Sequence, residues 1–356
     1  MNNGKLLIVS SSPHLLNNES TRSIMWIVSL FLLPSIAFGI FAFGAYAGLV
    51  VLFSILFSIL TEAAVQLIRK QKVTILDGSA FLTGALIGMN MPPQVPLYIP
   101  IITSIFATGL VKHAFGGLGQ NWANPAIAGR VFALVAWSKY MTTWTVPFDA
   151  DAVTTATPLG ALKSALLEGN IDLSSTFAEQ VGLSKFFYGP IQVLQSLPGE
   201  VIKTDTTYFN LFFGLKGGCI GEISVFLLLL GGIYLIYRKI VSIDIPLSFF
   251  LTVAVVAWIF DGTRFGLGYS HGDPIFHLLT GGCALGALFM ATDMVTTPIT
   301  IKGRIIFGIG CGLITMLVRM YGGLPEGVSL SILFMNMLTP MIDRFIKVKP
   351  FGFVKK

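Results

Sequence analysis

Long apolar runs, separated by short polar segments, make up most of the chain. A transmembrane helix needs about 20 mostly apolar residues, and about ten runs approach or reach that length. They lie near 23–44, 45–68, 78–93, 97–115 and 124–141 in the first half, and near 220–237, 244–260, 275–292, 303–320 and 327–345 in the second. The pattern predicts an all-α polytopic membrane protein with about ten transmembrane helices.

The third run differs from its neighbours. The run at 78–93 is short, rich in Gly and Met, and ends in Pro92-Pro93. We therefore predict a broken or half-spanning helix, which a membrane protein tolerates only where other protein covers it.

The two halves resemble each other weakly. The segment 82–89 (LTGALIGM) is similar to 279–286 (LTGGCALG), and a Gly-Gly pair precedes the last run of each half. Five spans per half is an odd number, so two such repeats must be inverted relative to each other. Inverted repeats with interrupted helices often place a binding site near the midplane. Taken alone, this pattern favours a solute channel or transporter, which we keep as an alternative.

Basic residues follow every second run and predict the orientation, because cytoplasmic loops are enriched in Lys and Arg. They are Arg69, Lys70 and Lys72; Arg238 and Lys239; Lys302 and Arg304; and Arg344, Lys347, Lys349, Lys355 and Lys356. The chain then divides into a cytoplasmic segment 1–22, a first membrane half 23–141, an external loop 142–219, a second membrane half 220–345 and a cytoplasmic basic tail 346–356.

Composition supports a membrane protein and narrows its chemistry. Hydrophobic residues make up 54% of the 356 residues and charged residues only 11%. The net charge of +6 follows from the basic residues beside the spans, so no nucleic acid is expected. The three dispersed cysteines are too few for an ordinary iron–sulfur cluster, and we expect no metal.

A Thr-rich polar stretch, 151–160, lies in the predicted external loop. Pro158 suits the first position of a short helix, which makes Thr157 the N-cap. The plain interpretation is a capping hydroxyl. The alternative is a phosphate ester on Thr157, because the free N–H groups and positive end of a helix suit a phosphate.

A second polar segment, 116–125, connects the fourth and fifth runs and contains Asn121 and Asn124 before Pro125. One interpretation is a turn in which Asn124 caps the next helix. The other is that both carboxamides bind the edge of a planar ligand that needs a donor and an acceptor side by side.

Three acidic residues are candidates for an ion pathway. Glu62 lies inside the second run, where a carboxylate is costly unless it faces a cavity or a partner. Asp77 and Asp293 lie at predicted helix ends, where capping is the simpler role. Any of the three is able to bind Na⁺ or relay protons.

The polar stretch 261–277, between the seventh and eighth runs, is predicted to be external like Thr157. Arg264 is a candidate partner for a phosphate or a carboxylate, and His277 a candidate neighbour of a flavin ring. For His271 we favour a solvated loop. The spacing of the two histidines does not place them on one helical face, which argues against a metal site.

These motifs together resemble one family over residues 12–345: the membrane subunits shared by Rnf-type ion-translocating oxidoreductases, where they are the D subunits, and sodium-translocating NADH:quinone reductases, where they are the B subunits. Asp151, Thr154, Ala156 and Thr157 match its flavin-attachment motif, and Thr155 stands where the family usually has Gly. The resemblance implies FMN bound covalently through its phosphate to Thr157, and a non-covalent riboflavin near Asn121 and Asn124. It also implies a fold like that of urea and ammonium-type channels.

The resemblance further implies a component of an ion-translocating ferredoxin:NAD oxidoreductase in the bacterial inner membrane, relaying electrons between flavins and coupled to Na⁺ or H⁺ transport. The implied partners are a flavin transferase, the flavinylated G subunit, membrane subunits A and E, and subunits B and C that bind ferredoxin and NAD. The modest chain length favours the Rnf-type member over the quinone-reductase member. A solute channel without a redox role and a scaffold subunit remain the alternatives.

Overall fold

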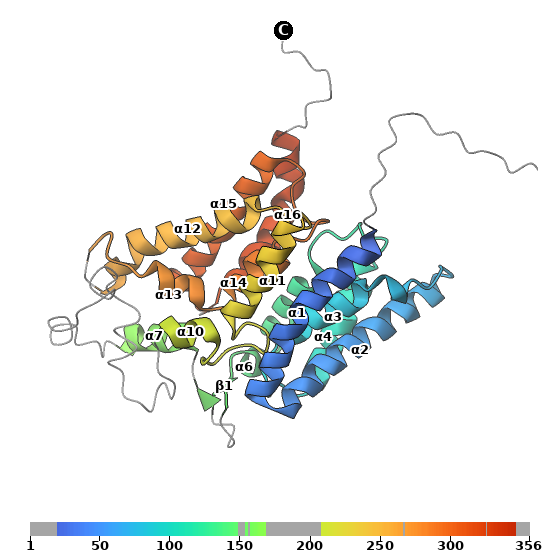
Figure 1. Cartoon of the computed structure of the whole chain (residues 1–356), viewed down its shortest axis with the longest axis horizontal. Coiled ribbons are helices and arrows are strands. Elements are labelled where there is room, and N and C mark those ends of the chain that lie inside the picture. The colour runs from blue at the N-terminus through green and yellow to red at the C-terminus, as the bar shows by residue number, and fades with distance from the viewer. Residues whose placement is uncertain are drawn as a thin grey trace, which may run out of the picture.

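The computed structural model describes residues 20–148, 154–155, 157–168, 208–265, 268–324 and 326–346. Most of them are helical (Figure 1), which confirms the all-α class, while the ten spans and their inverted arrangement stay predictions. Turns and irregular segments connect the helices, and one short antiparallel pair of strands is formed by β1 (Trp144–Thr145) and β2 (Thr154–Thr155), in which Trp144 lies opposite Thr155 and Thr145 opposite Thr154.

The first half contains α1 (Thr21–Phe43), α2 (Ala45–Ile68), η1 (Ile75–Asp77), α3 (Ser79–Met89), α4 (Tyr98–Ile105), the π-helix η2 (Phe106–Lys112), α5 (Pro125–Ala136) and α6 (Ser138–Met141). Between the halves lie α7 (Pro158–Glu168) and α10 (Tyr208–Phe213). The second half contains α11 (Val225–Tyr237), α12 (Asp244–Phe260), η4 (Asp261–Phe265), α13 (Pro274–Leu279), α14 (Cys283–Leu285), the π-helix η5 (Gly286–Met290), α15 (Ile301–Tyr321) and α16 (Val328–Phe345).

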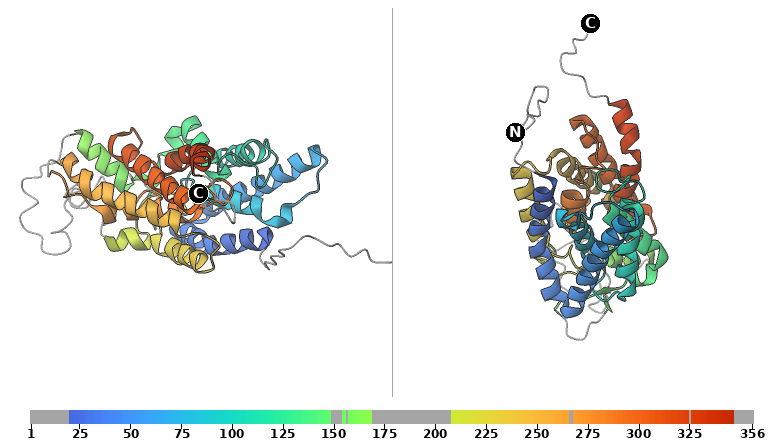
Figure 2. Two further views of the ribbon diagram at one scale, coloured as in Figure 1. Left: turned by 90° about the horizontal axis from the view of Figure 1, so that it is seen from above. Right: turned by 90° about the vertical axis from the view of Figure 1, so that its right-hand side faces the viewer.

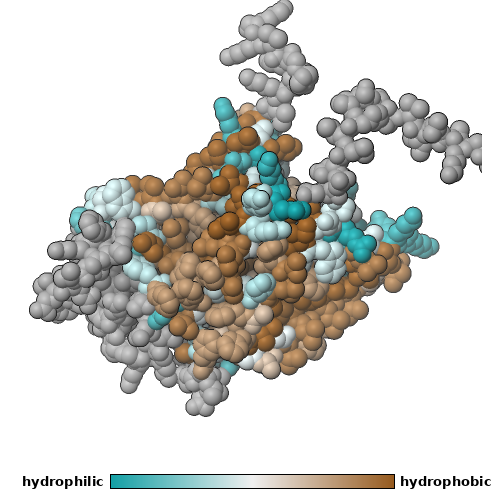
Figure 3. Space-filling model, viewed as in Figure 1, coloured by the Kyte–Doolittle hydropathy of each residue, from teal (hydrophilic) through white to brown (hydrophobic). Residues whose placement is uncertain are grey.

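Four helical segments of the described residues are long and apolar enough to cross a membrane: Thr21–Phe43, Ala45–Ile68, Asp244–Arg264 and Ile301–Tyr321. Shorter apolar helices accompany them, at Ser79–Met89, Tyr98–Lys112, Pro125–Ala136 and Val225–Tyr237. The face shown in Figure 3 is largely apolar, with polar side chains gathered toward its upper end. The prediction of a membrane protein is confirmed.

The third run forms a short helix that stops inside the protein, as predicted. Helix α3 has 11 residues, and two residues far along the chain supply partners for carbonyl groups at its end and just after it. Ile220 N–H donates to the Met91 carbonyl (3.1 Å) and Gly221 N–H to that of Met89 (2.9 Å). We call Ile220 and Gly221 the strap. Ser35 in α1 also binds it, by donating its hydroxyl to the Gly221 carbonyl (2.9 Å). The backbone of a broken helix is thus satisfied by protein rather than by water.

The eighth run is also broken, which was not predicted from the sequence. Helix α13 ends at Leu279, and α14 begins only after Gly281 and Gly282, whose φ angles are +63° and +65°. Glycine adopts such left-handed angles without steric cost, so these two residues allow the chain to turn between the two short helices.

The halves are two helix groups that lie side by side when viewed from above (Figure 2). In the first, α2 packs against α3 and α4; in the second, α12 packs along α15, and α15 against α16. Contacts of α1 with α11 and of α5 with α16 join the groups. Gly84 permits the close approach of α3 to α2, because a Cβ there would lie 2.5 Å from the Ile55 Cα.

The two ends of the molecule differ in what they carry. Helix α1 begins and α16 ends at the upper end in Figure 1, which we call the terminal side. The strand β1 and helices α6, α7 and α10 lie toward the lower end, which we call the loop side.

Candidate functional site

Thr157 begins helix α7 on the loop side. Its Oγ1 accepts the Gly160 N–H (3.1 Å), and its carbonyl accepts the Ala161 N–H (2.8 Å). The predicted N-cap is therefore confirmed. Of the other motif residues, Asp151 and Ala156 lie outside the described residues, and Thr154 is described only as part of β2.

The hydrogen bonding of Thr157 is compatible with an esterified phosphate. The hydroxyl oxygen serves the cap as an acceptor, so replacing its hydrogen by phosphorus leaves the hydrogen bond from Gly160 intact. The oxygen also stands at the start of an 11-residue helix, whose amide groups and dipole favour negative charge. Thr157 is 3% exposed.

Helix α7 is docked onto the second half. Lys163 donates to the carbonyls of Gly322 and Leu324, the latter at 2.9 Å, beyond the end of α15. Leu159 occupies the space above Gly281, where the eighth run is broken. Burial, and then the positive charge of Arg264, lower the pKa of Lys163. The start of α7 is thus held beside the broken helix.

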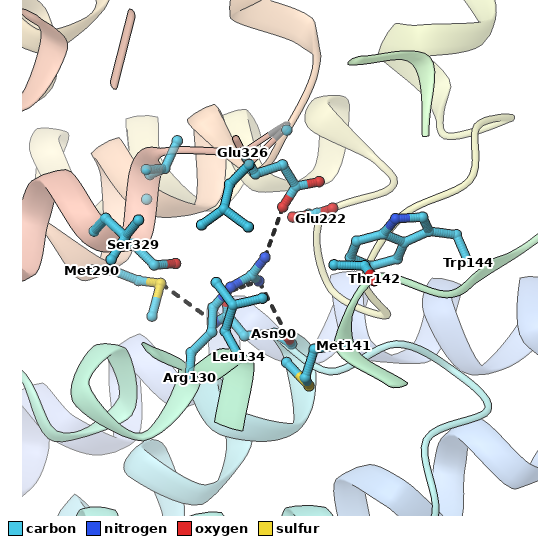
Figure 4. A pocket seen from close by; sticks show the side chains of 16 residues that line it. Asn90, Arg130, Leu134, Met141, Thr142, Trp144, Glu222, Met290, Glu326 and Ser329 are labelled. Atoms are coloured by element: carbon cyan, nitrogen blue, oxygen red, sulfur yellow. Dashed lines mark hydrogen bonds and ion pairs between the residues drawn. The ribbon is translucent and has the colours of Figure 1, made fainter. Parts of the chain in front are cut away.

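A cavity on this side, which we call the loop-side cavity, lies between the two halves (Figure 4). Arg130 of α5 donates to Glu326 Oε2 (2.7 Å) and to Asn90 Oδ1 (2.8 Å). Glu222 accepts the Cys219 N–H through Oε1 (3.0 Å). Among the described residues, neither Glu222 Oε2 nor Glu326 Oε1 has a hydrogen-bond partner. Two carboxylate oxygens at this cavity are therefore free to accept hydrogen bonds from a ligand or a water molecule, as far as the described residues go.

This cluster was not predicted from the sequence. Arg130 and Glu326 come from opposite halves of the chain, and only the fold brings them together. The signal that could have found them was an arginine and a glutamate within or beside apolar runs, where unpaired charges are rare.

His277 and Arg264 meet at Asp261 rather than at a shared surface. His277 Nε2 lies 3.2 Å from Asp261 Oδ2, and Arg264 Nη1 lies 3.3 Å from Asp261 Oδ1. His277 is fully buried in α13, and its carbonyl accepts from Arg319 (2.6 Å). Arg264 thus binds a carboxylate, one of its two predicted partners. His271 is exposed, as its loop interpretation requires.

On the terminal side, three predicted residues line one cavity of about 110 Å³, which we call the terminal-side cavity. Asn121 and Asn124 come from the segment before α5, and Asp293 follows η5 of the other half. Asn124 caps α5 through Ala126 (3.0 Å) and donates to the Met290 carbonyl (3.2 Å), so its capping role is confirmed. Asn121 differs, because its buried Oδ1 has no partner among the described residues.

Asp293 binds locally on the cavity wall. Its Oδ1 accepts the Val295 N–H (3.4 Å), and its Oδ2 accepts the Thr296 hydroxyl (3.3 Å). Within the described part of the chain no basic side chain forms an ion pair with it.

Glu62 and Asp77 belong to one buried network with a lysine that was not singled out from the sequence. Lys112 Nζ lies 2.7 Å from Glu62 Oε2 and 2.7 Å from Ser79 Oγ. The Ser79 hydroxyl donates to Asp77 Oδ1 (2.7 Å). Gln66 donates to the other Glu62 oxygen (3.2 Å). Lys112 was detectable as a lysine inside the apolar run 97–115.

Comparison with known proteins places the chain. The NQR2, RnfD, RnfE family matches residues 8–352. The chain belongs to this family. It is 45% identical to the D subunit of the proton-translocating ferredoxin:NAD(+) oxidoreductase complex of Clostridium ljungdahlii over 349 residues, which are 98% of this chain and 96% of that protein.

Two further members of the NQR2, RnfD, RnfE family extend the comparison. The D subunit of the Na(+)-translocating ferredoxin:NAD(+) oxidoreductase complex of Acetobacterium woodii is 43% identical, over 98% of this chain and 96% of that protein. The D subunit of the ion-translocating oxidoreductase complex of Stutzerimonas stutzeri is 39% identical, over 94% and 93%. The resemblance stated from the sequence motifs is confirmed along nearly the whole chain.

Proposed function

We propose that this protein is the D subunit of an Rnf-type ion-translocating ferredoxin:NAD⁺ oxidoreductase and relays electrons across the membrane through two flavins. The full-length similarity to the D subunits of such complexes supports the assignment. The observation that carries the flavin part is Thr157, a capping threonine whose hydroxyl hydrogen is not used in the described hydrogen bonds.

On this proposal, Thr157 holds FMN through its phosphate. The isoalloxazine supplies the electron chemistry, and the protein supplies position and electrostatics. Helix α7 orients the attachment point, and Lys163 holds α7 against the chain that follows α15. A covalent tether is useful on an external face, where free FMN would be lost by dilution.

The second flavin, riboflavin, is assigned to the part of the terminal-side cavity that Asn121 and Asn124 line, which leaves the part lined by Ser79 and Lys112 to ions. Asn121 fits this role because its buried Oδ1 lacks a partner among the described residues and the residue lines the cavity. Asn124 fits less directly, since both ends of its carboxamide are already bonded, and it serves to join α5 to the Met290 carbonyl.

Ion movement is assigned to Glu62, Asp77 and Asp293. The first two share one hydrogen-bonded network, and Asp293 lines the cavity that this network adjoins. The names of the two relatives quoted with a stated ion differ, one proton and one Na⁺, although their identities to this chain are 45% and 43%. Overall similarity therefore does not choose the ion.

The architecture we propose is a pair of inverted five-helix repeats with both termini in the cytoplasm. Three features support it: each half has a broken helix, each contains a π-helix, and the equivalent helices α1 and α11 pack together, as do α5 and α16. The terminal side would then be cytoplasmic and the loop side external. The partner subunits would bind ferredoxin and NAD.

The test is in-gel fluorescence under ultraviolet light after denaturing electrophoresis, with the chain expressed beside its flavin transferase. We expect a fluorescent wild-type band, a dark Thr157→Ala band and a fluorescent Thr143→Ala band, since Thr143 is an exposed threonine on the same side that lies outside the motif. A dark wild-type band beside a transferase that labels another substrate would contradict covalent FMN and favour a channel or scaffold role.

A further inference from the structure

The ammonium group of Lys112 lies among oxygen atoms of the kind that bind metal cations. Its side chain is 2% exposed, and its Nζ lies 2.7 Å from both the Glu62 carboxylate and the Ser79 hydroxyl. The Ser79 hydroxyl is in turn polarised by Asp77. Carboxylate and hydroxyl oxygens are the ligands that a small hard cation prefers. The lysine side chain thus fills a site built for positive charge.

This site opens on the terminal-side cavity. Ser79 and Lys112 both line that cavity, together with Asp293 from the other half. A volume of about 110 Å³ exceeds what one water molecule requires. A hydrated cation arriving from the terminal side would therefore meet Lys112 before it reached Glu62.

The charged and titratable groups around Lys112 come from several elements. Glu62 belongs to α2, Asp77 to η1, and Asp293 follows η5. His113 follows Lys112, and its Nε2 lies 3.6 Å from Glu62 Oε1, without a hydrogen-bond partner among the described residues. Glu62 and Lys112 together are neutral, so adding a cation to the intact pair would leave an uncompensated buried charge, which is strongly unfavourable.

We propose that a monovalent metal cation exchanges one for one with the proton of Lys112 at Glu62. The cation binds the Glu62 carboxylate, the Lys112 ammonium releases one proton to water in the terminal-side cavity, and neutral Lys112 remains beside the occupied site. The net charge of the pair is zero before and after the exchange. Lys112 is thus the residue that couples cation entry to proton exit.

This exchange has a pH signature. Because one proton leaves for each cation bound, mass action raises the half-saturating Na⁺ concentration about tenfold for each unit by which the pH falls. Arginine cannot release its proton in a protein, so Lys112→Arg should abolish Na⁺ binding. Methionine removes the competitor, so Lys112→Met should bind Na⁺ more tightly and without this pH dependence.

The experiment is equilibrium binding of radioactive Na⁺ to the purified complex without electron donor or acceptor, together with proton release measured by a pH dye in weak buffer. The exchange rests on the proposed ion-coupled role, but binding without turnover and a separate in-gel flavin assay keep the two distinguishable. Lys216→Met is the matched control, because Lys216 is equally buried and donates to the Leu279 carbonyl, outside the Glu62 network.

The expected results are one proton released per Na⁺ in wild type and in Lys216→Met, no Na⁺ binding in Lys112→Arg, and pH-independent binding in Lys112→Met. If Lys112→Met does not assemble, the proton count in wild type decides. Na⁺ binding without proton release, a wild-type pH dependence in Lys112→Met, or no Na⁺ binding to wild type would each overturn the proposal.

Discussion

Two buried carboxylate sites, one beside each cavity, differ in whether their oxygens have partners. Behind Lys112, which lines the terminal-side cavity, Glu62 has Lys112 on one oxygen and Gln66 on the other, so the carboxylate is satisfied. At the loop-side cavity, Arg130 pairs with one oxygen of Glu326, while Glu326 Oε1 and Glu222 Oε2 have no partner among the described residues. We call the Glu62 arrangement closed, because both carboxylate oxygens have partners, and the Glu222 and Glu326 arrangement open, because one oxygen of each has none among the described residues.

This contrast predicts how much stability a substitution at each site should cost. A closed buried pair is stable only while both members remain, because the survivor is a buried unpaired charge. An open carboxylate oxygen is buried without a hydrogen bond that offsets its desolvation, so removing its charge should cost little stability. The same type of substitution should therefore have a large effect at one cavity and a small one at the other.

The largest effect is expected at the closed pair. Lys112→Met leaves Glu62 buried without its cation and should lower the free energy of unfolding by about 3–5 kcal/mol. The double variant Glu62→Met/Lys112→Met should recover most of that loss, since two apolar side chains replace a neutral pair. Thermal unfolding of the purified protein in Na⁺-free buffer measures both, and a double variant no more stable than the single would refute the pairing.

A smaller loss is expected where α3 approaches α2. Gly84→Ala places a methyl group 2.5 Å from the Ile55 Cα, so the helices must separate, at a cost of about 1–3 kcal/mol. Gly48→Ala is the control on α2, because its Cβ would meet only Ile40 atoms at 3.5 Å and beyond. Equal melting temperatures for the two variants would show that the close approach is not required.

A loss of about 1 kcal/mol, confined to α7, is expected on removing the cap in protein made without flavin transferase. Thr157→Ala removes the acceptor of the Gly160 N–H, whereas Thr157→Ser keeps it. Hydrogen exchange of the α7 amides should accelerate in the alanine variant and not in the serine variant. Unchanged exchange in Thr157→Ala would mean that docking alone holds the helix.

The open cluster should tolerate a neutral replacement. Glu222→Gln keeps the acceptor for the Cys219 N–H and removes a charge from an oxygen without a partner among the described residues. The change in unfolding free energy should stay within about 1 kcal/mol. A destabilisation as large as that of Lys112→Met, measured in the same thermal assay, would contradict the predicted difference between the two sites.

The smallest effect concerns pH and α7. Burial, and then Arg264, lower the pKa of Lys163 in the docked helix below the ordinary value of 10.5. The charged form is thus disfavoured on docking, so the penalty is present below the lowered pKa and is relieved as the pH rises toward 10.5. A spin label at Leu167→Cys should become less mobile over that alkaline range, and Lys163→Met should abolish the change.

Local features of the fold were predictable because they depend on neighbouring residues. The run 23–44 contains no charged residue and forms most of α1, Pro92-Pro93 signalled the end near α3, and Thr157 and Asn124 stand before prolines as caps do. Each of these signals acts within a few residues, so periodicity and capping rules apply directly.

The pairings were not predictable because they join distant residues. Lys112 meets Glu62 from another helix, and Arg130 meets Glu326 from the other half, so only the packed fold decides which charges are neighbours. The break in the eighth run was also missed, since Gly281-Gly282 within an apolar run is equally typical of close helix packing.

The strap at Ile220 and Gly221 has a consequence for truncated forms of the protein. Carbonyl groups at the end of α3 receive their partners from this strap, and Ser35 reaches it across 186 residues of sequence. A chain that stops before residue 220 would lack the donors that pair with the Met89 and Met91 carbonyls. We therefore expect a chain truncated before the strap to be less stable than the whole protein, because buried carbonyl groups without partners are costly.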